Sequence, residues 1–87
     1  MRAIISVVGK DKPGILAFVA KKCADNDVNI LDVSQTVLGE TFTMMMVCEV
    51  DSKIFTDFVS LMEQEGKKQG LVIHVMHEDI FNAMHKI

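Results

Sequence analysis

The residues with the clearest potential for chemistry lie in one short loop, Gly9-Lys10-Asp11-Lys12-Pro13-Gly14, between an apolar run and a helical pattern. Pro suits the first turn of a helix, whose free backbone N–H groups attract an anion such as a carboxylate. Gly14 would let a ligand approach the backbone closely. Pro-Gly pairs also form simple turns, so the loop by itself leaves ligand binding and turn formation both open.

Catalytic groups do not come together in any local motif. The chain offers no Ser/His/Asp or Cys/His arrangement. Asp11 and Asp32 are the nearest approach to catalytic acids, and no base is paired with either. We therefore expect a protein that is not an enzyme.

The cysteines and histidines also lack the spacing of a metal site. Cys23 and Cys48 are far apart and form no CxxC motif, so we expect two small buried hydrophobic side chains in a reducing cytoplasm. His74 and His77 are three residues apart in a strand-like segment and would point to opposite faces. Glu78 follows them, but the expected turn leaves its position open. We expect no metal and no cofactor.

Composition excludes several classes of protein. The 87 residues are 49% hydrophobic, carry a net charge of −3 and contain no apolar run of the roughly 18–20 residues that span a membrane. Nucleic-acid binding requires clustered Lys and Arg, and this chain is acidic without a basic stripe. No small-residue cleavage site follows Arg2, so we expect a cytoplasmic protein.

The hydrophobic pattern switches repeatedly between the periods of a strand and a helix. Gly39-Glu40 is typical of a hairpin turn, and Gly70 of a helix end. The order of elements predicts the α+β class and a ferredoxin-like βαββαβ sandwich, a four-stranded antiparallel sheet with two helices on one face. The expected elements are a strand over 2–8, a helix over 15–25, strands over 28–38 and 41–50, a helix between 52 and 70, a strand over 71–77 and a short C-terminal helix over 78–87.

Two local features accompany this pattern. Helix caps are expected at Asp11 or Lys12 and at Asp51-Ser52. The strand over 28–38 alternates, with Leu31, Val33 and Val37 directed into the core.

The second face of the predicted sheet poses a problem, because two helices cover only one side. Met45, Val47 and apolar residues of the first and fourth strands lie on the other side. An uncovered apolar face is unusual for a small monomer. We therefore predict a homodimer or a higher homo-oligomer, in which the terminal helix covers part of this face in its own chain or in the partner.

Several ferredoxin-like functions lack their required side chains here. Metal chaperones carry CxxC in the first loop, RNA-binding domains stack bases on strand aromatics, and acylphosphatase-like proteins need an Arg in the first loop. The first loop here has no Cys or Arg, and Phe42 is the single aromatic residue of the predicted strands.

The segments VGKDKPGIL and Val28-Asn29-Ile30 resemble the ACT domain, a small regulatory module of amino-acid metabolism. The ending HEDIFNAMHKI is similar to that of stand-alone single ACT-domain proteins of bacteria and archaea, a largely uncharacterised family similar to the glycine-cleavage regulator group. The resemblance implies one ACT domain over 1–87, with its core in 1–77 and a C-terminal helix in 78–87.

The resemblance also implies a ligand site between two subunits. It places Gly9, Asp11, Pro13, Gly14 and Ile15 of one subunit opposite Asn29 and Ile30 of another, around an amino acid. The Asn29 amide both donates and accepts hydrogen bonds, although it could equally cap the preceding turn. The implied function is a regulatory module that binds an amino acid or similar small ligand at a dimer interface. The alternative is a ligand-free interaction or dimerisation module acting through the sheet face and C-terminal helix.

Overall fold

The computed structural model describes residues 1–84, and the predicted order of elements is confirmed. Residues 85–87, the end of the expected helix over 78–87, lie outside the described residues. The elements are β1 (Arg2–Lys10), α1 (Ile15–Asp25), β2 (Asn29–Leu38), β3 (Thr41–Glu49), α2 (Phe55–Lys68), β4 (Leu71–His77) and α3 (Glu78–Met84).

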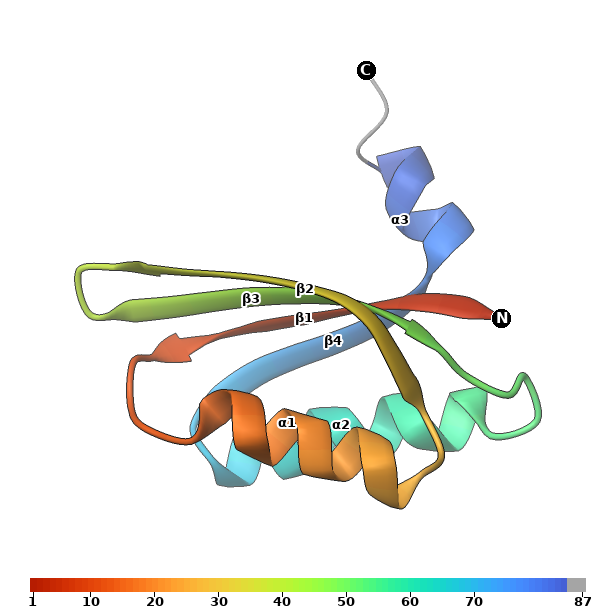
Figure 1. The fold of residues 1–87 in the computed structure, drawn as a ribbon, viewed down its shortest axis with the longest axis horizontal. Helices are drawn as coiled ribbons and strands as arrows, with labels where there is room; N and C mark the ends of the chain where they lie inside the picture. The colour runs from red at the N-terminus through yellow and green to blue at the C-terminus, as the bar shows by residue number, and fades with distance from the viewer. Residues whose placement is uncertain (85–87) are drawn as a thin grey trace.

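The four strands form one antiparallel sheet in the order β2-β3-β1-β4, which confirms the ferredoxin-like fold. Both long helices, α1 and α2, lie on one face of the sheet, and α3 rises from the opposite face (Figure 1). We call these the helix face and the outer face. The loop after β1 and the start of β2 lie at opposite ends of the sheet.

The core lies between the helix face and the two long helices. Alternate residues of β1, β3 and β4 point into it, as their period of two predicts. Side chains of this size each stabilise the fold by about 1.5–3 kcal/mol when fully buried. The fully buried members with the largest side chains are Phe58, Ile5, Met44, Met46, Met62, Val7, Val19 and Val50.

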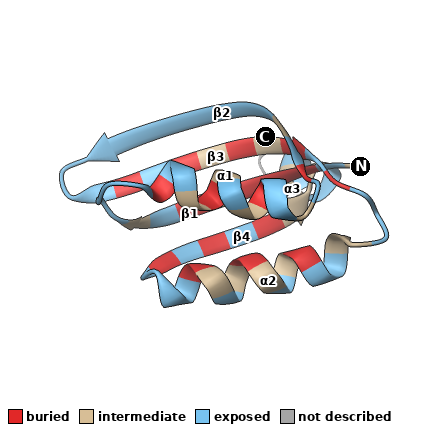
Figure 2. Ribbon diagram, turned by 60° about the horizontal axis from the view of Figure 1, so that its bottom comes forward, coloured by how far each residue is buried: buried red, intermediate tan, exposed pale blue. Residues whose placement is uncertain are grey.

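The prediction that β2 directs one face into the core is wrong. No residue of β2 is buried, and only Ile30 is partly buried. Figure 2 shows β2 exposed along almost its whole length, beside the buried stripes of β3 and β1. The register also shifts between Ile30 and Asp32, so that Leu31 is an extra residue in the ladder. Val33 and Val37 do face the helix side, opposite Met46 and Phe42, but β2 is an edge strand that the helices do not cover.

The expected helix caps are also wrong. The N-cap residue of α1 is Gly14, three residues beyond Asp11, and that of α2 is Ile54. Neither helix has a side-chain cap. Asp51 instead stabilises the turn before α2, where its Oδ1 accepts a hydrogen bond from the Lys53 N–H at 2.9 Å.

The short helix α3 is held at its first turn. The backbone N–H of Asp79 donates a hydrogen bond to Nδ1 of His77 at 3.0 Å. Arg2 on β1 forms an ion pair with Glu78 at 3.7 Å. The helix packs against β1 and β4, yet Ile80 and Met84 remain exposed.

Candidate functional site

The loop over 9–14 is held in place by two hydrogen bonds to distant parts of the chain. The backbone N–H of Asp11 donates to the carbonyl of Glu40 in the β2–β3 hairpin at 2.7 Å. The Lys12 ammonium donates to the carbonyl of Gln69, after α2, at 2.6 Å. The loop is therefore positioned by the hairpin on one side and by the end of α2 on the other.

Gly14 gives the loop its backbone shape and begins α1. Its φ of +87° lies in the left-handed region, which glycine adopts without strain. A β-carbon at this position would meet no atom within 4 Å, so the space beside the backbone is open. The Gly14 carbonyl accepts the Phe18 N–H at 2.9 Å, whereas the N–H groups of the first turn have no partner within an α-helix. Since no side chain caps α1, this end of the helix is suited to a bound carboxylate.

The remaining loop residues have different surroundings. Asp11 and Pro13 are exposed beside Gly14. The Ile15 side chain is buried in the core, so only its backbone is available to a ligand. A β-carbon on Gly9 would lie 2.6 Å from Cδ2 of Leu71, so the glycine at this position allows β1 and β4 to pack closely.

Asn29 and Ile30 lie at the other end of the sheet. Gly9 is paired with Phe42 of β3 and Asn29 with Glu49, seven residues further along the same strand. Seven residues of a strand span about 24 Å. One chain therefore does not bring Asn29 and the loop together, and a ligand touching both would require a second chain.

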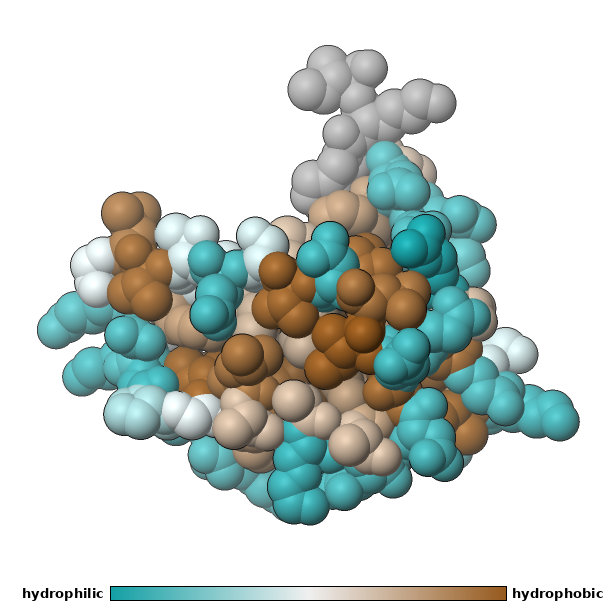
Figure 3. Space-filling model, viewed as in Figure 1, coloured by the Kyte–Doolittle hydropathy of each residue, from teal (hydrophilic) through white to brown (hydrophobic). Residues whose placement is uncertain are grey.

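The edge strand β2 carries exposed hydrophobic side chains close to α1. Figure 3 shows hydrophobic residues gathered on the face of the molecule that carries β2 and α1. A free edge presents unpaired backbone N–H and C=O groups, and soluble proteins usually protect such edges. Here the exposed hydrophobic residues of β2 and α1 are Leu16, Leu31, Val33, Val37 and Leu38.

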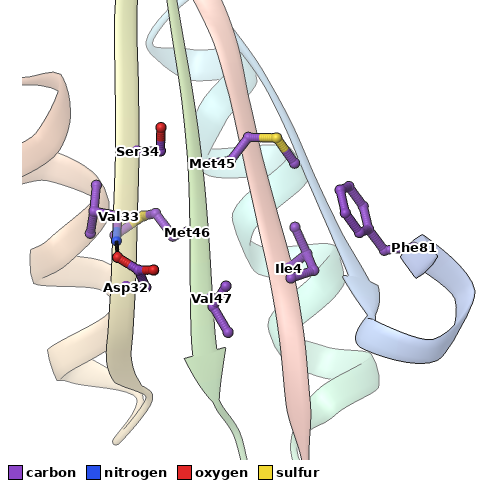
Figure 4. Close-up of a pocket in the computed structure, with 8 residues that line it drawn as sticks. All are labelled: Ile4, Asp32, Val33, Ser34, Met45, Met46, Val47 and Phe81. Carbon is purple, nitrogen blue, oxygen red and sulfur yellow. Dashed lines mark hydrogen bonds between the residues drawn. The ribbon is translucent and has the colours of Figure 1, made fainter. Parts of the chain in front are cut away.

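A second candidate site lies on the outer face, between α3 and β2. We call it the outer pocket. It has a volume of about 210 Å³. In Figure 4, Ile4 and Phe81 face each other on one side, with Met45 and Val47 on the floor and Asp32 and Ser34 at the β2 side. The lining residues are Ile4, Asp32, Val33, Ser34, Met45, Met46, Val47 and Phe81.

The alternation in the sequence indicated which side chains face the outer pocket, but not how those of β2 at its rim pair with those of β3 on its floor. Met45 and Val47 were expected on this face from their alternation alone. Asp32 and Ser34 lie beside them because Asp32 pairs with Val47 and Ser34 with Met45. That pairing depends on the extra residue Leu31, for which the sequence pattern contains no signal.

The thiols of both cysteines are free and buried in the folded protein. Burial raises the pKa of the Cys23 and Cys48 thiols to about 11, which keeps both protonated and unreactive at neutral pH. Within residues 1–84, no three His, Cys, Asp or Glu side chains are grouped so as to hold a metal ion. No helix in this part of the chain has the length and apolar character needed to cross a membrane.

Comparison with known proteins gives a consistent result. The family model described as "ACT domain" matches residues 2–76. A UPF0237 protein, YjhC, of Lactococcus lactis is 46% identical over 87 residues, with all of both chains covered. A UPF0237 protein of Methanococcus maripaludis is 47% identical, with 97% of this chain and 96% of the relative covered.

Solved structures agree with this assignment. An ACT domain protein from Streptococcus pneumoniae is 48% identical, with a TM-score of 0.83 and 93% of each chain covered. A putative glycine cleavage system transcriptional repressor shares the fold, with a TM-score of 0.79 and 23% identity over 88% of this chain and 47% of the other. The match over 2–76 and the full-length relatives in bacteria and archaea show that the chain belongs to the ACT domain family and, within it, to the UPF0237 group.

Proposed function

We propose that this chain is a regulatory module that binds a small amino acid at an interface between two copies, and that it is not an enzyme. The observation that carries the proposal is the uncapped N-terminus of α1 beside open space at Gly14. ACT domains are typically regulatory modules that bind amino acids. The two free buried cysteines suit a reducing cytoplasm, where we propose that the protein acts.

The edge strand β2 supplies the interface in this proposal. If the β2 strands of two copies pair antiparallel about a twofold axis, the start of one strand lies beside the end of the other. Asn29 of each copy then lies near the hairpin of its partner. The first loop is bonded to that same hairpin through the Asp11 N–H and the Glu40 carbonyl. Pairing also covers the exposed Val33 and the exposed Leu16 of α1.

The ligand's groups have complementary partners in this arrangement. The first-turn N–H groups after Gly14 bind the α-carboxylate, helped by the partial positive charge of the helix end. The exposed Asp11 carboxylate attracts the ammonium group. Asn29 of the second copy donates or accepts a further hydrogen bond. The exposed Pro13 and the half-buried Ile30 form the walls, while Gly9 and Ile15 shape the loop from beneath.

Calorimetry of the purified protein against a panel of the common amino acids tests the proposal. We expect binding by at least one amino acid, and a loss of at least about tenfold in affinity for Gly14→Val and for Asn29→Ala. Gly70→Ala is the matched control, because Gly70 also has a positive φ and open space but lies after α2. Failure of every amino acid to bind at millimolar concentration contradicts the proposal.

Mixing the two defective variants tests whether the site spans two chains. In a mixed dimer, one site carries both defects and the other carries neither. After unfolding and refolding together, an equal mixture should regain about a quarter of the wild-type sites. A site contained in one chain would regain none.

The alternative is a ligand-free module that docks through the outer face and α3. The apolar outer pocket and the exposed Ile80 and Met84 favour this candidate. It predicts that Gly14→Val and Asn29→Ala leave assembly, or binding of a partner, intact. Polar changes at Met45 or Phe81 should instead disrupt that assembly or binding.

A further inference from the structure

The register shift at Leu31 decides which side chain of β2 lies at the outer pocket. A regular ladder would pair Leu31 with Val47. It would pair Asp32 with Met46, whose side chain is fully buried on the helix side. The shift instead pairs Asp32 with Val47 and thereby places the Asp32 carboxylate on the outer face, at the pocket.

Burial of apolar side chains does not account for this shift. Val33 and Val37, which the shift turns toward the helix side, remain 37% and 51% exposed. A bulge also interrupts the ladder of hydrogen bonds, and bulges beside binding sites commonly redirect a side chain. The main chemical consequence of the bulge is the position of the Asp32 carboxylate.

This carboxylate has an oxygen available to a ligand. Its Oδ1 accepts the Val33 N–H at 2.9 Å, and Figure 4 shows the second oxygen on the side of Val47. Among residues 1–84, Asp32 takes part in none of the ion pairs. The pocket therefore presents a negative charge that the described part of the chain does not neutralise.

The opposite side of the outer pocket is apolar and aromatic. Ile4 is 6% exposed, and the Phe81 ring faces it over β1. Strand β1 lies two strands from β2, which amounts to about 9.6 Å. Met45 and Val47 of β3 form the floor between the two sides. A ligand that fills the pocket therefore meets a carboxylate at one end and hydrocarbon at the other.

The size and lining of the pocket restrict the ligand further. Its volume of about 210 Å³ equals that of about seven water molecules at about 30 Å³ each, and pockets for drug-sized ligands have about 300–1,000 Å³. The lining residues include no Lys, Arg or His that could bind an anion. A ligand that carries its own carboxylate would be repelled by Asp32.

We propose that the outer pocket binds a small arylalkylamine, a ligand with an aromatic body, a short alkyl chain and no carboxylate. Its ammonium group donates a hydrogen bond to the Asp32 carboxylate, and such charge-assisted bonds are the stronger ones. Its body lies over Val47 and Ile4 and reaches the Phe81 ring. This site is separate from the first loop, and pairing of β2 strands through their edges leaves it open.

Titration of the full chain with three matched probes, followed by NMR of the backbone amides, tests the charge requirement. The probes are 2-phenylethylamine, the neutral 2-phenylethanol and the anionic phenylacetate. We expect the amine to bind about fivefold more tightly than the alcohol, and phenylacetate to bind most weakly. Asp32→Asn should abolish the difference between amine and alcohol. Asp57→Asn, the same change at an exposed position of α2, is the matched control and should preserve it.

A second pair of variants tests the location. Val47→Phe fills the floor of the pocket and should abolish binding of the amine, whereas Thr43→Phe, at an exposed position of the same strand, should not. Gly14→Val should leave amine binding unchanged, so loss of amino-acid binding in that variant affects the proposed function alone. Three results would each overturn the proposal. They are equal affinities of amine and alcohol for the wild type, amine affinity unchanged by Asp32→Asn, and no amine binding at about 10 mM.

Discussion

A β-carbon on Gly66 would lie 2.7 Å from Cγ1 of Ile73, so α2 packs against β4 at a distance that only glycine permits. Gly66 is buried in the middle of this contact, near the C-terminal end of α2. The close approach sets the position of the helix over the sheet. It also brings the end of α2 to the first loop, where the Gln69 carbonyl accepts a hydrogen bond from Lys12.

The first prediction concerns this contact. Gly66→Ala should destabilise the protein by about 1–3 kcal/mol through overpacking, although alanine is the better helix former by about 1 kcal/mol. Urea denaturation measures the change. Ile73→Val removes one of the clashing carbons and should recover part of the loss when combined with Gly66→Ala. Additive effects in the double-mutant cycle would show that the two residues do not interact.

The second prediction concerns Glu65, which joins α1 to α2. Its carboxylate forms ion pairs with Lys22 and Lys68, each at 2.8 Å, and these hydrogen-bonded ammonium groups lower its pKa from 4.5 to about 2. A carboxylate whose pKa is lower in the folded than in the unfolded state stabilises the folded protein at any pH above the unfolded pKa. This stabilisation is lost as the pH falls through the folded pKa. The stability difference between wild type and Glu65→Gln should therefore be constant above about pH 5 and vanish between pH 4.5 and 2.

Urea denaturation of both proteins at pH 7, 5 and 3 provides this test. Glu63→Gln is the control, because it removes the same charge from α2, and no ion pair of Glu63 is found among residues 1–84. A difference between wild type and Glu65→Gln that persists unchanged at pH 3 would show that the ion pairs do not lower the pKa.

The third prediction concerns the reactivity of the thiols. With a pKa of about 11, Cys23 and Cys48 carry about 0.1% thiolate at pH 8, and both are fully buried. An alkylating reagent should label these thiols in the native protein only as fast as unfolding exposes them. In denaturant it should label both residues at once. Mass spectrometry follows the labelling. Val72→Cys, at an exposed position of β4, should react within minutes in the native protein, whereas fast labelling of the natural cysteines would contradict their burial.

The fourth prediction concerns the imidazole at the start of α3. His77→Ala removes the acceptor of the Asp79 N–H and should weaken the helix by about 1 kcal/mol, the usual effect of losing a cap. Hydrogen exchange of the α3 amides should accelerate about fivefold while the β1 amides keep their protection. His74→Ala is the control, since His74 lies exposed on the outer face. Equal effects of the two variants would show that the His77 contact does not hold the helix.

Local chemistry made much of the fold predictable from the sequence. The change of hydrophobic period at Ile15, Leu71 and Glu78 marks the starts of elements within the chain, and those starts are confirmed. The loop motif ending at Gly14 and the apolar outer face could also be found, because both depend on neighbouring residues along one strand or turn. The helix caps could not, because a cap depends on the turn geometry and not on residue type alone.

Periodicity and turn preferences act over a few residues, so the order of residues alone specifies which elements form, their succession and the chemical character of the loop before α1. Only the tertiary structure shows that β2 is an uncovered edge, that Leu31 is an extra residue, and that Gly14 and Asn29 of one chain lie at opposite ends of the sheet. It also decided the close approach of Gly66 to Ile73. Strand order and register depend on contacts between residues far apart in the chain, and those contacts leave no periodic signal in the sequence.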